Sequence, residues 1–348
     1  MHVSTSIEIA RHTLLSCGLI LAVGTLAAFV SQRIKVPDVA IFLLAGIAIG
    51  PHALALIDIG AGSALNQVIL LFGASYILFD GGAALRFSVL KQVWITILVL
   101  ATVGVLITAA VTALAASYVL GLPLAVAALL DLLKQSLIGI VAGIALGYLA
   151  ALLIAHEKWA FLAEYAPVVT LVAVIAAYFA ASDLQASGFM AVFVFGIVLG
   201  NKETLGFQME AGEEQRLAEF VLTTSFIMRL FIFILLGAQV DFAEVGRHWM
   251  GGVAVVAVLM LVARPMAVFL CALPDRRACW RLEELLLMCW TRETGVIPAA
   301  LAGLLLGVRA PGADIIASVT FVAILMTILI QAPTTEWLGR RLGLLEKE

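Results

Sequence analysis

Charged residues are scarce in this sequence of 348 residues. Only 12% of the residues are charged and 64% are hydrophobic, with a mean hydropathy of +1.14, whereas soluble domains carry about 25% charged residues. This scarcity excludes a water-soluble fold. The formal net charge of −3 provides no basic surface, and no nucleic-acid-binding motif is present, so we expect no nucleic-acid partner.

Cysteines are also few, and they are widely scattered. Cys17, Cys271, Cys279 and Cys289 form neither a CxxC pair nor a metal-binding spacing. The sequence therefore predicts no disulfide framework and no zinc site. We expect no metal, no cofactor, no catalytic residue and no enzyme activity.

Long apolar stretches dominate the chain. A helix needs about 20 apolar residues to cross a bilayer, and eleven stretches approach that size: 12–32, 37–57, 64–85, 92–120, 135–155, 165–182, 184–201, 219–240, 248–272, 284–308 and 314–335. They predict an all-α, polytopic membrane protein whose main partner is the lipid bilayer. We expect residues 1–348 to form a single transmembrane domain without a soluble regulatory domain.

The basic residues predict the orientation, because Lys and Arg are retained on the cytoplasmic side of a membrane. With the N-terminus outside, only Arg11, Lys134, Arg247 and Arg309 fall on the outer side. Thirteen basic residues then fall on the inner side: Arg33, Lys35, Arg86, Lys91, Lys158, Lys202, Arg216, Arg276, Arg277, Arg281, Arg340, Arg341 and Lys347. This asymmetry predicts a cytoplasmic C-terminus.

One junction does not fit a continuous series of crossings. Gly121, Leu122 and Pro123 are typical of a turn, and the apolar residues 124–130 that follow end at Asp131. Seven residues rise only about 10 Å as a helix, which is too short to cross. The distribution of Lys and Arg between the two sides of the membrane is consistent with either zero or two crossings at this junction. A missing helix pair near residues 130–131 would therefore leave that distribution unchanged.

Three arginines lie inside apolar stretches, namely Arg229, Arg264 and Arg292. Each costs roughly 2.5 to 3.5 kcal/mol at a helix centre on insertion scales, so a compensating contact is required. Two interpretations remain open. Each arginine either forms a structural ion pair or acts on a carboxyl group that takes part in transport.

Acids inside the apolar stretches are rarer. Asp80 lies in YILFDGGAAL, and Glu293 lies beside Arg292. Burial favours the neutral form of a carboxyl group, whereas a nearby arginine favours its charged form. Asp80 is therefore either a titrating group or the fixed partner of an arginine, and Glu293 is either a second such group or a local partner.

The stretch 284–308 is interrupted by Gly295 and Pro298. Proline removes a backbone donor, and broken membrane helices tend to line cavities where ions or water satisfy the freed groups. In secondary transporters such breaks occur in matched pairs from inverted repeats. The N-terminal half contains no comparable break, and the junction after Leu122 is its natural place.

Several motifs together resemble the cation:proton antiporter superfamily, in particular its NhaP-like Na⁺/H⁺ exchanger branch. They are KVPDVAIFLLAGIAIGP, FDGG at Phe79–Gly82 where the family has FEGG, SGFMAVFVFGIVLGN, FIFILLGAQVDF, ARP at Ala263–Pro265 and TRETGVIPAALA. The resemblance covers nearly the whole chain. It implies an inverted-repeat antiporter fold, with 13 helices expected for the family, a homodimer and a location in the cell (inner) membrane.

The sequence departs from the family at two places. The Thr-Asp-Pro and Asn-Asp motifs, which supply the cation-binding carboxylates in the family, do not occur and would belong between Leu130 and Asp131. Where the family often has Gly-Leu-Arg-Gly-Ala-Val-Pro, alignment on Pro298 places Thr294 at the arginine position. Arg292 lies two residues earlier.

The resemblance implies exchange of a monovalent cation, Na⁺ first, for H⁺ by alternating access. Asp80 with Arg264 is the expected coupling pair, and Arg229, Arg292, Glu293 and Thr294 are further candidates. A degenerate or regulatory membrane protein without transport is the alternative, because the ion-binding motifs are missing. A channel or a carrier for an organic solute is a third class, although no second polar break supports it.

Overall fold

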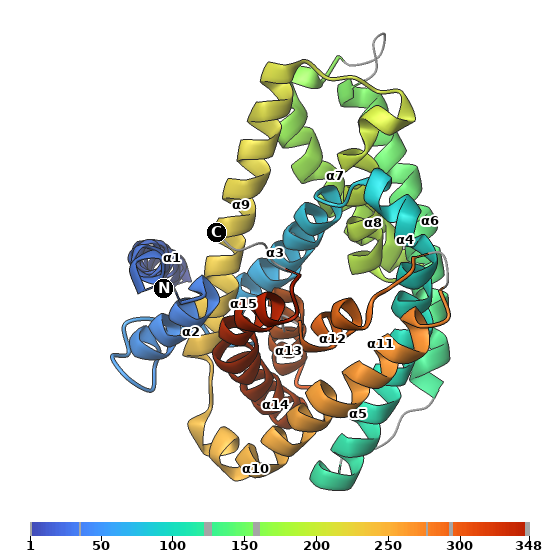
Figure 1. Ribbon diagram of the computed structural model, residues 1–348. Coiled ribbons are helices and arrows are strands. Elements are labelled where there is room, and N and C mark those ends of the chain that lie inside the picture. The colour runs from blue at the N-terminus through green and yellow to red at the C-terminus, as the bar shows by residue number, and fades with distance from the viewer. Residues whose placement is uncertain are drawn as a thin grey trace.

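The computed structural model describes residues 2–34, 36–121, 127–155, 161–275, 278–291 and 295–344. These residues form helices and no strands, which confirms the all-α prediction (Figure 1). The helices are α1 (His2–Ile34), α2 (Asp38–Ile49), α3 (Ala64–Ala83), α4 (Phe87–Val99), α5 (Val105–Leu120), α6 (Ala127–Ala155), α7 (Ala166–Asp183), α8 (Gly188–Gly200), α9 (Ala211–Ala238), α10 (Phe242–Val258), α11 (Arg264–Ala272), α12 (Leu282–Trp290), α13 (Val296–Gly307), α14 (Ala313–Met326) and α15 (Ala332–Arg341).

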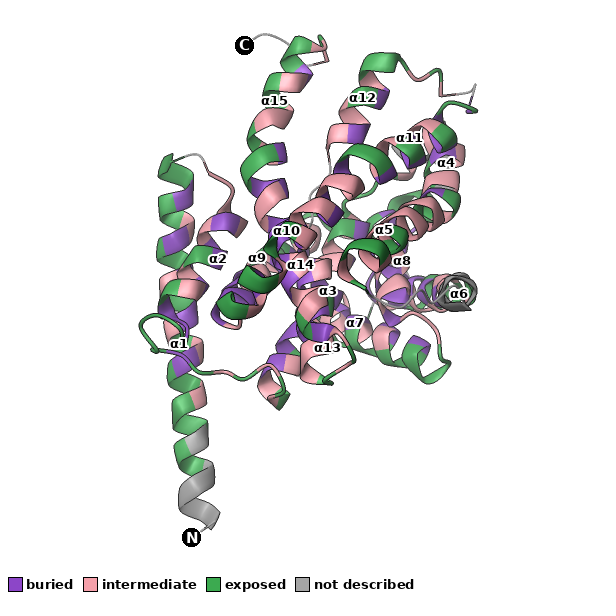
Figure 2. Cartoon of the chain, turned by 90° about the horizontal axis from the view of Figure 1, so that it is seen from below, coloured by how far each residue is buried: buried purple, intermediate pink, exposed green. Residues whose placement is uncertain are grey.

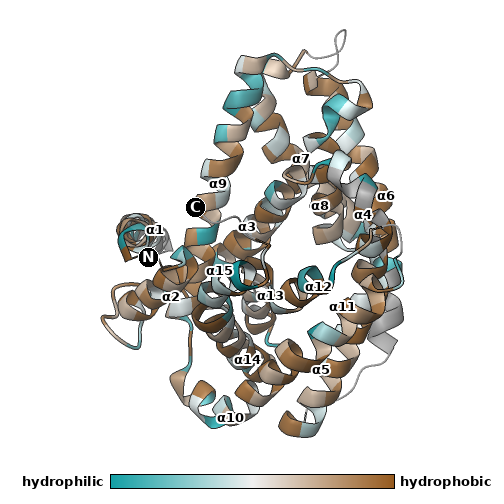
Figure 3. Cartoon of the chain, viewed as in Figure 1, coloured by the Kyte–Doolittle hydropathy of each residue, from teal (hydrophilic) through white to brown (hydrophobic). Residues whose placement is uncertain are grey.

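The exposure pattern is that of a protein surrounded by lipid. Large apolar side chains face outward, among them Leu14 at 75% and Tyr118 at 95% exposure. Exposed residues cover the outer faces of α1 and α6 (Figure 2), and hydrophobic residues dominate the helices while hydrophilic ones gather near helix ends (Figure 3). In water such a surface would aggregate, whereas a bilayer accommodates it.

Among the residues that the structure describes, eight helical spans are long and apolar enough to cross a membrane. Three further apolar helices, α2, α8 and α13, contain 10–17 residues and are shorter than the roughly 20 residues that a crossing needs. Each of them overlaps a stretch predicted from the sequence. The number of eleven crossings itself stays a prediction.

The long helix α9 lies between two hydrophobic clusters, with α2 on one side and α3 on the other (Figure 1). The first cluster contains residues of α1, α2, α3, α9, α10, α13 and α14. The second contains residues of α3, α6, α7, α8 and α9. Helices α3 and α9 therefore contribute side chains to both clusters, and Tyr76 of α3 and Ser225 of α9 are buried between helices.

Glycine allows α3 to cross α8 at close range. A Cβ atom on Gly82 would overlap the carbonyl oxygen of Phe193, and one on Gly196 would overlap that of Phe79. Helices α2 and α9 cross in the same reciprocal way through Gly46 and Gly237. Small residues permit such backbone contact between membrane helices.

The predicted helix 37–57 is shorter in the structure, because α2 ends at Ile49. Gly50 has an extended backbone (ψ 174°) and is followed by Pro51, which disfavours a helical conformation in the residue before it. Residues 51–63 form turns and irregular backbone before Ser63 caps α3 by accepting a hydrogen bond from the Asn66 amide at 3.2 Å. The prediction that the helix continues to residue 57 is therefore wrong, because an apolar composition occurs here in irregular backbone as well as in helix.

Three of the predicted helices contain a π-helical turn, at Leu100–Gly104, Leu259–Ala263 and Thr327–Gln331. Pro265 follows the second turn and Pro333 follows the third. Proline lacks the amide donor that continues the α-helical ladder, so the ladder is interrupted at these places. Such turns are frequently found at functional sites.

The junction after α5 is only partly described. Gly121 ends α5 in the left-handed conformation (φ 69°), as the predicted turn requires, while Leu122 and Pro123 lie outside the described residues. Helix α6 then begins at Ala127 rather than at 135 and continues through position 131. The earlier start has a simple reason: charged residues are disfavoured in the hydrocarbon core, not in the part of a helix that extends beyond it. No residue of α5 is buried among its described side chains.

Candidate functional site

Helix α3 carries the acid that the sequence singled out. Tyr76 and Asp80 are four residues apart, so they share one face of α3. Tyr76 is fully buried and Asp80 is half-buried. Both follow Gly73, whose own Cβ position would lie 2.9 Å from the Ile232 side chain of α9, so this face of α3 is directed toward α9.

Helix α9 presents a matching pair of polar residues. Ser225 and Arg229 are also four residues apart, and both lie close to the Asp80 carboxyl group, Ser225 as a neighbouring hydroxyl and Arg229 as a neighbouring positive charge. Ser225 is buried to 1% exposure. The structure thus brings Asp80 close to Arg229. Arg229 is one of the three arginines for which the sequence analysis predicted a carboxyl group as a neighbour.

Arg229 also has a second acidic neighbour. Its Nη1 lies 3.6 Å from Oδ2 of Asp38, at the start of α2. Both side chains are about one-third exposed, and such partly exposed pairs contribute at most about 1 kcal/mol. The pair is therefore weak as a stabilising contact, and its main effect is to hold the guanidinium between α2 and α3.

Two hydroxyl groups beside Asp80 lack partners. The Tyr76 hydroxyl lies near Thr170 of α7, Thr224 of α9 and the Asp80 carboxyl group. Neither this hydroxyl nor that of Ser225 makes a hydrogen bond within the described part of the chain, and both atoms are inaccessible to solvent. With Asp80 they form a cluster of oxygen atoms in which no sulfur or nitrogen ligand takes part.

Arg264 lies elsewhere, at the start of α11 after a π-helical turn. Its Nε is buried and finds no acceptor among the described residues, and Cys289 of α12 lies close enough to interact with its charge. Neither Arg264 nor Asp80 belongs to an ion pair within 4 Å in the described ranges. The expected ion pair between Asp80 and Arg264 is thus absent here: Asp80 has Arg229 of α9 as its charged neighbour, and Arg264 interacts with Cys289 of α12.

The break in the stretch 284–308 is confirmed. Helix α12 ends at Trp290, Thr291 is extended (ψ 103°), and α13 begins at Val296 after an extended Gly295. The candidates Arg292, Glu293 and Thr294 lie outside the described residues. Pro298 falls in the first turn of α13, where proline is tolerated.

Asn201 fixes the end of α3 that carries Asp80. Its Oδ1 accepts a hydrogen bond from the Phe87 amide at 2.6 Å, and its Nδ2 donates to the carbonyl oxygens of Leu85 at 2.6 Å and Ile197 at 2.8 Å. The side chain thereby joins the loop after α3 to the end of α8. Helix α3 is held against α8 by this amide and by the glycine crossing.

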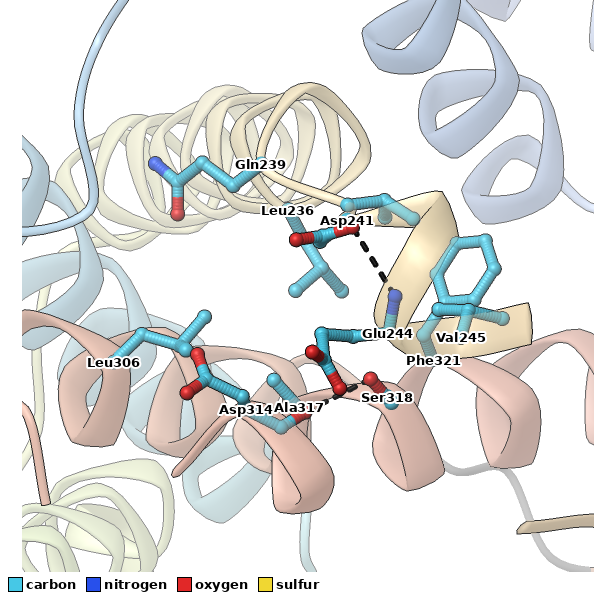
Figure 4. A pocket seen from close by; sticks show the side chains of 11 residues that line it. Leu236, Gln239, Asp241, Glu244, Val245, Leu306, Asp314, Ala317, Ser318 and Phe321 are labelled. Atoms are coloured by element: carbon cyan, nitrogen blue, oxygen red, sulfur yellow. Dashed lines mark hydrogen bonds between the residues drawn. The ribbon is translucent and has the colours of Figure 1, made fainter. Parts of the chain in front are cut away.

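An acidic pocket lies apart from this site, between the ends of α9 and α13 and the starts of α10 and α14 (Figure 4). Asp241, Glu244 and Asp314 line it. Two of them have structural roles: Asp241 caps α10, and Glu244 pairs with Arg247 and His248. The described residues contain no group of three or more His, Cys, Asp or Glu that is arranged to hold a metal ion.

The sequence interpretation did not single out Ser225, Tyr76 or Asp38. A usable signal was present, because Tyr76–Asp80 and Ser225–Arg229 are both polar pairs with helical spacing in apolar helices. Asp38 follows Pro37 in one of the motifs quoted above. An acid at a helix start is normally explained by the helix dipole. For this reason the sequence alone did not indicate that Asp38 contacts Arg229.

Fold and site together define a polytopic helical membrane protein with charged groups between its helices. The profile of the family described as "Sodium/hydrogen exchanger, transmembrane" matches two segments, residues 18–131 and 124–341. The chain therefore belongs to the sodium/hydrogen exchanger family.

Individual relatives are distant. The chain is 25% identical over 154 residues to "K(+)/H(+) antiporter NhaP2" of Shewanella sp. (strain ANA-3), covering 44% of this chain and 25% of that protein. It is 30% identical over 116 residues to "Na(+)/H(+) antiporter 1" of Methanocaldococcus jannaschii, covering 33% and 26%. The matches thus span about a quarter of the length of these curated relatives.

A solved structure of the sodium proton antiporter MjNhaP1 from Methanocaldococcus jannaschii has the same fold. The two superpose with a TM-score of 0.79 at 23% identity, covering 98% of this chain and 99% of that one. At this identity the likeness concerns the fold.

Proposed function

We propose that this chain exchanges a monovalent cation for protons across a membrane by alternating access. The observation that carries the proposal is the Asp80 carboxyl group, half-buried between membrane helices beside the Ser225 hydroxyl and the Arg229 charge. Ionisable groups inside a membrane are costly and mark ion or proton pathways. The names of the relatives, K⁺/H⁺ and Na⁺/H⁺ antiporters, support the same activity.

The mechanism is competition for one carboxylate. The Asp80 carboxyl group holds either a proton or a partly dehydrated cation, and its burial together with the Arg229 charge decides which of them wins at a given pH. Because one site cannot hold both, inward movement of one ion is linked to outward movement of the other. The coupling needs no further cofactor.

Arg264 has a separate role in this proposal. It lies beside Cys289 rather than Asp80, so it would act on the transport carboxylate only in another conformation of the bundle. Arg292, Glu293 and Thr294 are kept as candidates because they fall in the break between α12 and α13. Broken helices of this kind line ion pathways in transporters.

Orientation and assembly are also proposed. The distribution of basic residues supports an outer N-terminus and a cytoplasmic C-terminus. A location in the cell (inner) membrane and a homodimer, in which a core bundle moves against a dimerising scaffold, follow from the family resemblance.

The alternative is a membrane protein without transport activity. Two observations favour it: the Thr-Asp-Pro and Asn-Asp motifs are missing, and the family profile matches in two segments that meet at residues 124–131. Helix α5, in which no described side chain is buried, directly precedes this junction. We propose that a helix pair that other members carry is missing here.

Reconstitution of the full chain into lipid vesicles separates these functions. Vesicles with an internal acidic load and a pH-sensitive dye receive Na⁺ or K⁺ outside. Antiport predicts cation-dependent dequenching that saturates with cation concentration. Silence with both cations would favour the protein without transport, and a current that does not saturate would favour a channel.

A further inference from the structure

The groups around Asp80 are arranged as two facing pairs. On α3, Tyr76 and Asp80 are one helical turn apart, and on α9, Ser225 and Arg229 are one turn apart. Asp80 lies close to both α9 residues, and Tyr76 lies close to Asp80. The structure therefore brings the oxygen-bearing groups of Tyr76, Asp80 and Ser225 close together between the two helices.

The hydroxyl groups of this cluster are buried without a partner. Tyr76 has 0% and Ser225 has 1% exposure, and neither hydroxyl makes a hydrogen bond in the described part of the chain. A buried polar group left unsatisfied costs about 1 to 3 kcal/mol. Both hydroxyls lie beside the same carboxyl group, so a ligand held by that carboxylate would also satisfy them.

The formal charges around the cluster define the charge of that ligand. Asp38 and Asp80 each carry one negative charge when ionised, and Arg229, which lies near both, carries one positive charge. The three groups therefore sum to −1. In the low dielectric between membrane helices, one monovalent cation balances this charge, whereas a divalent cation would leave an excess.

The ligand atoms agree with this charge. The carboxylate of Asp80 and the hydroxyls of Ser225 and Tyr76 offer oxygen only, which suits hard cations rather than soft transition metals. The nearby Thr170 hydroxyl donates its proton to the Pro167 carbonyl oxygen at 2.8 Å, so its oxygen remains an acceptor on the side of Tyr76. The positive charge of Arg229 lies near Asp80 as well, where it limits the affinity for a cation.

We propose that Asp80, Ser225 and Tyr76 form a binding site for one monovalent cation between α3 and α9. This inference rests on the proposed function, because it names the ligands of the carboxylate that exchanges the cation. It assigns direct ligand roles to Ser225 and Tyr76, which lie in helices outside the junction at residues 121–135.

The test uses the full-length chain with Na⁺ and K⁺ as probes and two readouts. One is the rise in Tm of the detergent-solubilised protein with cation concentration, and the other is dye dequenching in vesicles. Ser225→Ala and Tyr76→Phe are each expected to raise the half-saturating cation concentration about tenfold in both readouts, since each removes one ligand. The matched controls, Ser318→Ala and Tyr178→Phe, are expected to leave it unchanged.

Cation-free stability separates a ligand from a structural hydroxyl. Because each hydroxyl is unpaired without the ion, Ser225→Ala and Tyr76→Phe are expected to keep or raise the cation-free Tm. Loss of cation-free Tm in both variants, or unchanged half-saturation in both, would overturn the site. If only one variant folds, the half-saturating cation concentration of that variant decides whether the site is correct.

The two proposals fail differently. Wild-type protein that binds cation but does not exchange it would overturn the proposed function and leave the site intact. Exchange that is insensitive to both substitutions would overturn the site alone. Wild-type protein that neither binds nor exchanges Na⁺ or K⁺ would overturn both.

Discussion

Arg229 lies 3.6 Å from Asp38 and is also the positive charge nearest to Asp80. A single guanidinium on α9 thus faces one carboxylate on α2 and another on α3. We therefore expect changes at Asp38 to alter the environment of Asp80 through Arg229.

Asp38→Asn and Arg229→Gln are expected to have unequal effects. The Arg229–Asp38 pair is partly exposed, so its loss in Asp38→Asn costs less than about 1 kcal/mol of stability. Arg229→Gln removes the positive charge from both carboxylates and is expected to reduce exchange more strongly. Vesicle exchange and Tm measure the two effects, with Glu336→Gln in the exposed Arg340–Glu336 pair as the control. Equal exchange in the two variants would contradict this prediction.

Asp80→Asn is expected to lower cation-dependent exchange by about tenfold or more, which corresponds to about 1.4 kcal/mol in the limiting step. An amide is nearly isosteric but carries no charge and cannot exchange a proton. The initial rate of dye dequenching measures the effect over a range of pH. Asp58→Asn, in the exposed segment after α2, is the matched control. Unchanged exchange at every pH would remove Asp80 from the mechanism.

Arg264→Gln is expected to separate stability from activity. The Nε of Arg264 is buried without an acceptor in the described ranges, and an arginine at a helix centre costs roughly 2.5 to 3.5 kcal/mol on insertion scales. The variant should therefore keep or raise the Tm while exchange falls. A lower Tm together with normal exchange would identify Arg264 as a structural residue instead.

Gly82→Ala and Gly81→Ala form a matched pair within FDGG. A Cβ atom at Gly82 would overlap the Phe193 carbonyl oxygen, whereas nothing lies within 4 Å of the corresponding position at Gly81. Overpacking typically costs about 1 to 3 kcal/mol, while an alanine in place of an unobstructed helical glycine gains about 0.5 to 1 kcal/mol. Gly82→Ala should lower the Tm and Gly81→Ala should keep or raise it. A rise in Tm for both variants would show that α3 and α8 are further apart.

Much of the fold was predictable because membrane insertion depends on local composition. Apolar stretches of the sequence identified each region that forms an apolar helix in the described part of the chain, and Gly295 with Pro298 identified the break between α12 and α13. Composition does not distinguish helix from irregular backbone, however. For this reason the segment 51–57, which is apolar but follows Gly50 and Pro51, was wrongly extended into a helix.

The site was less predictable because its contacts join residues far apart in the chain. Asp80 and Arg229 were both candidates, but only the packing of α3 on α9 brings them together. The expected partner of Asp80, Arg264, lies instead beside Cys289. Ser225 and Tyr76 carry no charge, so their importance depends on burial without hydrogen-bond partners, a property that a sequence does not show.

The reciprocal glycine crossings restrict where the protein can bend. Backbone lies directly on backbone at Gly46 and Gly237 and again at Gly82 and Gly196, so little sliding is available at either crossing without a clash. The two crossings hold α2 against α9 and α3 against α8. We therefore expect the protein to bend at its π-helical turns, where the α-helical hydrogen-bond ladder is already interrupted. These turns are Leu100–Gly104, Leu259–Ala263 and Thr327–Gln331.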